Sequence, residues 1–113
     1  MFKRSDDNLL LDISEAISKI EKYTYQANYD LFSQDEKTID AVVRNLEIIG
    51  EAASKISEDF KREKVQIEWR KIIGLRNRII HEYFGIDLRI IWEVVSHYIP
   101  ELKKDIEFLK SEK

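Results

Sequence analysis

The chain has 113 residues, no cysteine and a formal net charge of −3. This length predicts one domain, residues 1–113, that is large enough to bury a core. The missing cysteines exclude disulfides and thiolate metal sites, and no apolar run approaches the roughly 18 residues of a membrane span. Since the first residues also lack an apolar signal core, we expect a cytoplasmic protein that does not enter a membrane.

The first predicted helix runs from about Asp6 to Tyr25, with Ser5 as its N-cap. Apolar residues recur in it at spacings of three and four, which places them along one face. These residues are Leu10, Ile13, Ile17 and Ile20. The segment 27–32 then breaks the pattern.

A second helix is predicted to begin after Ser33, because Ser33 and Glu36 form the S-x-x-E pattern of a capping box. Its apolar seam alternates spacings of three and four, which suits near-antiparallel packing in a bundle. The seam consists of Ile39, Val42, Leu46, Ile49, Ala53 and Ile56. A ladder of surface ion pairs is predicted along another face, from Arg44, Glu47, Glu51 and Lys55. Alternatively, Arg44 lines a pocket.

The polar stretch from Ser57 to Ile67 is interpreted as a connector with a turn of helix around Phe60. A third helix is predicted from about Glu68 to Phe84. Gly85 is well placed to end it, because glycine favours the backbone conformation found just after a helix C-terminus.

Asp87 can cap a fourth helix, whose apolar positions continue at heptad-like spacing to Leu109. Pro100 should kink or split this helix, because its ring clashes with the carbonyl group of Ser96. No strand-like alternation occurs anywhere in the sequence. The predicted fold class is therefore all-α, an antiparallel bundle of four to five helices.

Two glycines lie inside predicted helices, Gly50 and Gly74. Each costs about 1 kcal/mol relative to alanine, which suggests that a backbone or a ligand approaches closely there. We interpret them as marking one helix crossing. Of the two histidines, His97 has no comparable polar neighbours in the sequence, so we assign it to the surface or to packing.

Positive charge is concentrated between residues 61 and 82, where seven basic residues oppose three acidic ones. This segment has a net charge of about +4, which leaves about −7 for the rest of the chain. The basic residues are Lys61, Arg62, Lys64, Arg70, Lys71, Arg76 and Arg78. Such a strip could attract a polyanion at one place, or it could be ordinary solvated helix surface.

At the end of this segment and just after it, the third helix carries Arg76, Asn77, His81 and Tyr83. A helix turns about 100° per residue, so Arg76 and Tyr83 share one face while Asn77 and His81 share a neighbouring one. A proton-transfer group, a fixed positive charge and a phenol in this arrangement suit chemistry on a phosphodiester. The alternatives are a structural histidine and a core-edge tyrosine.

Two blocks of the sequence, 41–53 and 74–87, resemble the signature blocks of the HepT-like branch of HEPN domains. The second block contains the R-x4-H-x-Y motif as Arg76, His81 and Tyr83, with the usual asparagine at Asn77. Trp69 before this block and the residues from Asp87 to Trp92 after it also fit. The resemblance extends from about Leu9 to Leu109, which is nearly the whole chain.

The resemblance implies a HEPN-like helical bundle that is often dimeric and acts as a metal-independent ribonuclease, the toxin of a toxin–antitoxin pair. It also implies a partner, a minimal nucleotidyltransferase antitoxin that transfers AMP onto Tyr83 and silences the toxin. Arg76 and His81 are then catalytic and Asn77 supports them. Arg70, Lys71 and Arg78 are candidates for RNA binding, and no metal or cofactor is expected.

The chemistry of the residues is consistent with this interpretation. RNA supplies its own nucleophile, the 2′-hydroxyl, and histidine can serve as base or acid near neutral pH. Arginine stays charged and can hold two phosphate oxygens. One histidine cannot readily be both base and acid in one step, so we predict a homodimer with the active cleft at its interface. The expected product ends in a 2′,3′-cyclic phosphate.

Two other functions remain open at this stage. The chain could be a non-enzymatic helical interaction module that binds a nucleotidyltransferase partner and a nucleotide. It could also be the substrate-presenting subunit of a two-chain nucleotidyltransferase that acts on a small molecule. The presence of both Arg76 and His81 favours the ribonuclease, since a scaffold needs neither.

Overall fold

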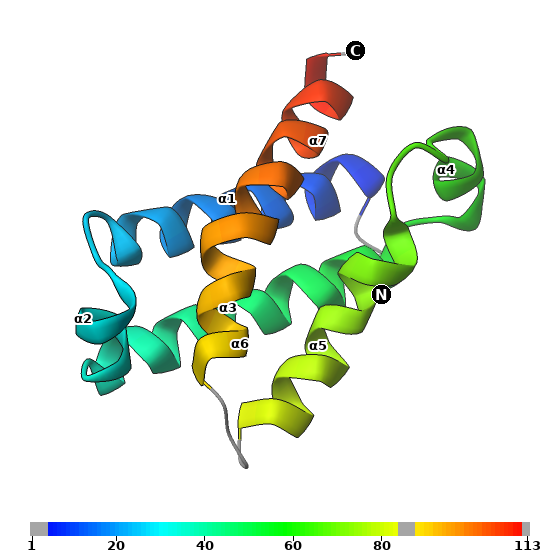
Figure 1. Cartoon of the computed structure of the whole chain (residues 1–113). Coiled ribbons are helices and arrows are strands. Elements are labelled where there is room, and N and C mark those ends of the chain that lie inside the picture. Colours follow the sequence, from blue (N-terminus) through cyan, green and yellow to red (C-terminus); the bar gives the residue numbers. More distant parts are fainter. Residues whose placement is uncertain (1–4, 84–87, 112–113) are drawn as a thin grey trace.

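The computed structural model describes residues 5–83 and 88–111, with side chains in all of these except 78–83. The described chain is helical and contains no strand, which confirms the all-α fold class (Figure 1). Its elements are α1 (Asp6–Thr24), α2 (Tyr29–Ser33), α3 (Glu36–Lys55), α4 (Glu58–Glu63), α5 (Trp69–Tyr83), α6 (Leu88–Glu93), the π-helical segment η1 (Val94–Tyr98) and α7 (Ile99–Ser111).

Helices α1 and α3 run antiparallel and pack along most of their length (Figure 1). The predicted cap of α1 is confirmed, because the Asn8 backbone N–H donates to Ser5 Oγ at 3.1 Å. Every residue of the two predicted apolar seams is buried. The spacing of apolar residues therefore identified correctly which faces of α1 and α3 form the core.

The predicted capping box at the start of α3 is wrong. Asp35 is the N-cap, and its carboxylate accepts from the backbone N–H and the hydroxyl of Thr38 at 3.1 and 2.6 Å. Ser33 instead ends α2, where its hydroxyl donates to the Asp30 carbonyl at 3.0 Å. Ser33 and Asp35 are both suitable N-cap residues, but Ser33 already belongs to α2, the short helix that Asn28 caps.

The predicted turn of helix around Phe60 is confirmed as α4. Its cap, Ser57, is tied to the start of α1, since the Ser57 N–H and hydroxyl donate to the Asp6 carboxylate at 2.9 and 2.7 Å. The far end of the connector is held by Trp69, whose Nε1–H donates to the Lys64 carbonyl at 3.1 Å. These contacts fix where α5 begins.

The final helical segment, α6–η1–α7, crosses α1 and α3 steeply (Figure 1). Pro100 distorts it, as predicted, but without splitting it into separate helices. The backbone widens into a π-helix just before the proline, and the Ile99 N–H donates to the Val94 carbonyl five residues earlier. This insertion is a known way for a helix to absorb a local mismatch.

The core includes residues from α1, α3, α5 and the final segment. Gly85 and Asp87, the predicted end of one helix and cap of the next, lie outside the described residues. No helix in the described part of the chain is long and apolar enough to cross a membrane.

Candidate active site

Helix α5 carries the motif, and its two sides face different neighbours. It packs against α3 on one side and approaches the α6–η1–α7 segment on another (Figure 1). Trp69, Ile72 and Leu75 are buried and fix its rotation about its own axis. The third predicted helix is confirmed; it begins at Trp69, one residue later than predicted, and its predicted end, Phe84, lies outside the described residues.

The contact between α5 and α3 is closest at Gly50. A Cβ atom added there would lie 3.0 Å from both the Cβ and the backbone N of Arg76, and 3.4 Å from the Ile73 carbonyl oxygen. Only a residue without a side chain allows the helices to approach this closely. The prediction that Gly50 marks a helix crossing is confirmed.

Arg76 is held at this crossing by a carboxylate from α3. Its Nη1 donates to Glu51 Oε2 at 2.7 Å, and the other oxygen, Oε1, lies 3.4 Å from Lys55 Nζ. The Arg76 side chain is 54% exposed. A guanidinium group has five N–H donors, so this single contact orients Arg76 and leaves donors for a phosphate.

Other motif positions follow Arg76 along the same helix. The backbone of α5 is helical through Tyr83, so the predicted register of positions 76, 77, 81 and 83 applies. The Asn77 side chain is exposed. The side chains of His81, Tyr83 and the RNA-binding candidate Arg78 lie outside the described residues.

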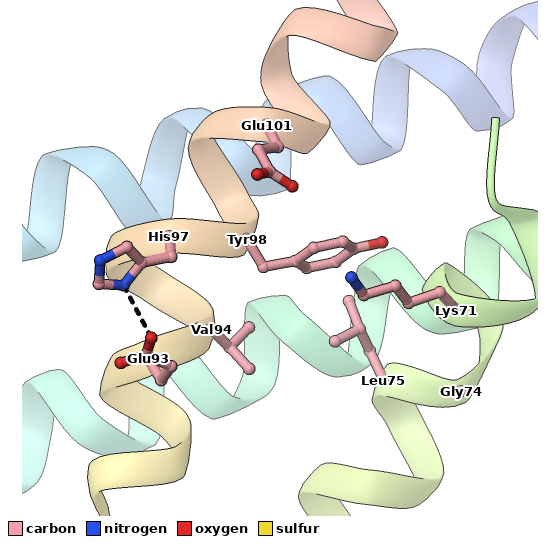
Figure 2. A pocket seen from close by; sticks show the side chains of 8 residues that line it. All are labelled: Lys71, Gly74, Leu75, Glu93, Val94, His97, Tyr98 and Glu101. Atoms are coloured by element: carbon pink, nitrogen blue, oxygen red, sulfur yellow. Dashed lines mark ion pairs between the residues drawn. The ribbon is translucent and has the colours of Figure 1, made fainter. Parts of the chain in front are cut away.

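The opposite side of α5 borders an open cleft of about 420 Å³ between α5 and the final helical segment (Figure 2). Lys71, Gly74 and Leu75 come from α5, whereas Glu93, Val94, His97, Tyr98 and Glu101 come from α6, η1 and α7. An added Cβ on Gly74 would meet nothing within 4 Å. Gly74 therefore does not mark a helix crossing, and that part of the prediction is wrong.

Tyr98 extends from η1 towards α5, and Lys71 Nζ lies 4.6 Å from the centroid of its ring (Figure 2). Burial raises the pKa of Tyr98, and the nearby carboxylates of Glu68, Asp105 and Glu101 raise it further. The phenol consequently keeps its proton near neutral pH and can donate a hydrogen bond.

His97 has two polar neighbours on its own helical segment. Its Nδ1 lies 3.1 Å from Glu93 Oε1 and 3.2 Å from the Ser96 hydroxyl (the Glu93 pair is drawn in Figure 2). The side chain is exposed at the rim of the cleft. The assignment of His97 to the surface is correct.

The basic segment does not form one continuous strip. Lys61 and Arg62 pair with Glu58 and Asp59 within α4. On α5, Arg76 lies against α3, whereas Lys71 lies in the cleft. Arg70 and Lys71, two candidates for RNA binding, are exposed on α5 and remain accessible to a ligand.

Sequence reasoning missed the role of Glu51 and the cleft residues of the final helical segment, although Lys71 and Gly74 had been singled out. Glu51 was assigned to a ladder within α3, and its pair with Lys55 is indeed present. Its partner Arg76 is 25 positions away, which periodicity within one helix cannot indicate. The only signal was Gly50, the neighbouring residue, whose cost in a helix pointed to a crossing.

Comparison with known proteins identifies the family. The sequence model of the family described as Ribonuclease HepT-like matches residues 13–109. A protein of Thermococcus cleftensis named "Probable ribonuclease HepT" is 46% identical over 108 residues, which cover 96% of this chain and 98% of that relative. MJ1380 of Methanocaldococcus jannaschii is 38% identical over 109 residues, which cover 96% of this chain and 100% of that relative.

A more distant relative in Shewanella oneidensis, named "mRNA nuclease HepT", is 23% identical over 129 residues, which cover 93% of this chain and 96% of that relative. No solved structure matches the chain. The helical fold and the motif on α5 define a protein of the HEPN type. The chain belongs to the ribonuclease HepT-like family, which confirms the resemblance and the expected enzyme class.

Proposed function

We propose that this protein is a metal-independent RNA endonuclease in which Arg76 and His81 act together on one phosphodiester. The observation that carries the proposal is the environment of Arg76. Its guanidinium is oriented by Glu51 at 2.7 Å yet remains 54% exposed, so it can still bind an anion. The close approach of α5 to α3 at Gly50, where an added Cβ would lie 3.0 Å from the Arg76 Cβ, brings the Arg76 side chain within reach of Glu51.

The roles follow from the chemistry of RNA cleavage. His81, as base, removes the proton of the 2′-hydroxyl, whose oxygen attacks the adjacent phosphorus while the 5′-oxygen leaves and takes up a proton. Arg76 stabilises the negative charge on the phosphate oxygens. Asn77, exposed beside Arg76, supports the substrate, and Arg70, Lys71 and Arg78 bind the RNA strand. The product ends in a 2′,3′-cyclic phosphate.

The proposal includes a homodimer, because one imidazole cannot act as base and acid in the same step. A two-fold axis beside the second half of α5 would bring two copies of His81 and two of Arg76 to one cleft. The exposure of Arg76 and Asn77 supports this arrangement, since neither side chain is covered within the described part of the chain.

We further propose that the protein is the toxin of a toxin–antitoxin pair and works in the cytoplasm. A minimal nucleotidyltransferase antitoxin would transfer AMP to the hydroxyl of Tyr83, releasing pyrophosphate from ATP. In the register of α5, position 83 lies seven residues after Arg76 on the same face. An added phosphate there would compete with RNA for Arg76 and block the strand.

The test is RNA cleavage by the unmodified protein in EDTA, comparing the parent with His81→Ala, Arg76→Ala and Tyr83→Phe. His81→Ala should lose about 10²–10⁴-fold in rate, the usual contribution of proton transfer, and Arg76→Ala should also lose most activity. Tyr83→Phe should keep activity and escape modification by the nucleotidyltransferase. Glu21→Gln is the matched control, because it removes another exposed interhelical ion pair, Glu21–Lys103 at 3.1 Å.

Cleavage by His81→Ala at the rate of the parent would rule out the catalytic assignment. If no variant cleaves RNA but the protein still binds the nucleotidyltransferase and a nucleotide, the interaction module is the correct interpretation. Mass spectrometry of the protein before the assay excludes inactivity caused by AMP already attached to Tyr83.

A further inference from the structure

Gly74 is a residue whose presence the fold itself does not explain. It lies inside α5, where glycine is less favourable than any other residue except proline. No glycine among the described residues has a positive φ, so a left-handed conformation is not the reason. Packing is not the reason either, since a Cβ added at Gly74 would meet nothing within 4 Å.

The space beside Gly74 is the cleft between α5 and the final helical segment (Figure 2). Its volume, about 420 Å³, lies within the range of small-ligand sites. Its wall on the far side includes η1, and π-helical insertions occur frequently at functional sites. A helix backbone left bare beside an open cleft allows a ligand to lie directly against it.

The charged side chains that line the cleft restrict the net charge of a ligand that could bind there. Glu93 and Glu101 both line it and would repel a phosphate or another anion. A cationic ligand is disfavoured because Lys71 already lies 4.6 Å from the Tyr98 ring, the position that a cation would take. The cleft therefore suits a neutral ligand with hydrogen-bond donors for carboxylates.

The apolar lining and the bare backbone at Gly74 favour a flat ligand. Leu75 and Val94 supply apolar surface, and Gly74 leaves α5 without a protruding side chain. Among the described residues, Glu101 has no hydrogen-bond or ion-pair partner, so its carboxylate is available to accept from a ligand. Tyr98, which keeps its proton near neutral pH, offers a hydroxyl donor.

We propose that this cleft is a nucleobase subsite, which holds an unpaired base of the RNA strand while an adjacent phosphodiester is cut. The proposal rests on the proposed ribonuclease function, and it adds the element that gives the enzyme a sequence preference. Proteins recognise single-stranded RNA by such contacts: they form hydrogen bonds with the edges of unstacked bases and pack against their faces. Guanine fits best, because its N1–H and its amino group can donate side by side to one carboxylate.

The position of the cleft along α5 agrees with this role. Position 81 lies seven residues after Gly74, which is two helical turns or about 10 Å further along the same face. A base held at Gly74 would therefore belong to a nucleotide next to the one that presents its 2′-hydroxyl at the motif. Lys71, on the same face, would contact the phosphate that leads away from this base.

The experiment compares the parent dimer with Gly74→Ala and Glu101→Gln, using RNAs that differ only at one base near a single cleavage site. The parent should cut the guanine substrate about tenfold faster than the uracil substrate, within the usual range for a pair of base contacts. Both variants should cut the two substrates at similar rates. Gly74→Ala should also melt a few degrees higher, since alanine favours the helix. Glu107→Gln, exposed on α7 outside the cleft, is the control and should retain the parent's preference.

A second measurement separates this proposal from the ribonuclease proposal. The amide resonance of Gly74 should shift when guanosine is added and should shift less with uridine, whether or not the protein cleaves RNA. RNA cleavage with a base preference that is unchanged in both variants would overturn the subsite. A Gly74 resonance that shifts with neither nucleoside would overturn it as well.

Discussion

A glycine inside a helix lies on each of two sides of α5, Gly50 of the neighbouring α3 and Gly74 of α5 itself, and the surroundings of the two glycines are opposite in kind. At Gly50, on α3, the space that a side chain would occupy is taken by atoms of α5. At Gly74, on α5, the missing side chain leaves space that no protein atom fills. The first glycine brings Arg76 against Glu51, and the second leaves a helix backbone bare beside a cleft. A glycine inside a helix therefore reveals its role only through what surrounds its absent Cβ.

The largest effect expected from this comparison is on stability, through Gly50→Ala. The new Cβ would lie 3.0 Å from two atoms of Arg76, one of them backbone, so the helices must separate. Overpacking of this kind destabilises a fold by about 1–3 kcal/mol. Urea denaturation should show this loss for Gly50→Ala, and a gain of up to about 1 kcal/mol for Gly74→Ala. Changes of the same sign in the two variants would contradict the comparison.

The burial of the apolar seams shows how much of this architecture the sequence determined. Repeats of three and four identified the core faces of α1 and α3 correctly, because burial of an apolar stripe is a local property of a helix. The cap of α3 was predicted wrongly, because Ser33 and Asp35 are both suitable capping residues. Ser33 is the last residue of a short helix that was not predicted, α2, and Asp35 caps α3. Phe32 of α2 is buried, and its ring centroid lies 5.1 Å from that of Trp92, a contact that spacing within one helix does not indicate.

The candidate site was predictable only in part, for the same physical reason. The motif on α5 was visible because its residues are close in the sequence. Glu51 and the wall of the cleft come from other elements, and their contacts with Arg76 and Lys71 depend on how three helical segments pack. Pro100 predicted a distortion, but the π-helical form of η1, which carries Tyr98, depends on how the neighbouring turns adjust.

The next largest effect is expected for Glu51→Gln, which tests whether Glu51 of α3 holds the Arg76 guanidinium in the orientation that RNA cleavage needs. The pair is half exposed, so its loss should cost the fold at most about 1 kcal/mol. The rate of RNA cleavage should fall several-fold, in kcat rather than KM, because the guanidinium is no longer held in one orientation. Steady-state kinetics with a defined RNA measures both constants, and circular dichroism checks the fold.

The control for Glu51→Gln is Glu21→Gln, which removes an equally exposed pair between α1 and α7. The two variants should have similar melting temperatures but different rates of cleavage. Equal rates would mean that Glu51 contributes nothing to Arg76 beyond the ordinary, small effect of a surface ion pair.

The smallest expected effect is a pH dependence of the melting temperature, which differs between the carboxylates on the α3 side of α5 and those beside the cleft. On the α3 side, Glu51 is balanced by Arg76 and Lys55. Beside the cleft, partial burial raises the pKa of Asp105 above its ordinary value of 3.8, and Glu101 and Glu68 raise it further. Asp105 thus destabilises the fold above its raised pKa, where it is charged, and has no effect below about pH 3.8, where it is protonated in both states.

Asp105→Asn should therefore raise the melting temperature slightly at pH 7, and the gain should disappear as the pH falls below about 3.8. Asp35→Asn provides the opposite sign, because hydrogen bonds from Thr38 lower the pKa of Asp35. Its charge stabilises the fold above pH 3.8, and that contribution is lost as the pH falls through the lowered pKa. Asparagine still caps a helix, so this loss should also be small. The melting temperatures of the two variants, measured from pH 3 to 7, should approach that of the parent from opposite sides as the pH falls. A gain from Asp105→Asn that persists at pH 3 would show that carboxylate repulsion beside the cleft is not its cause.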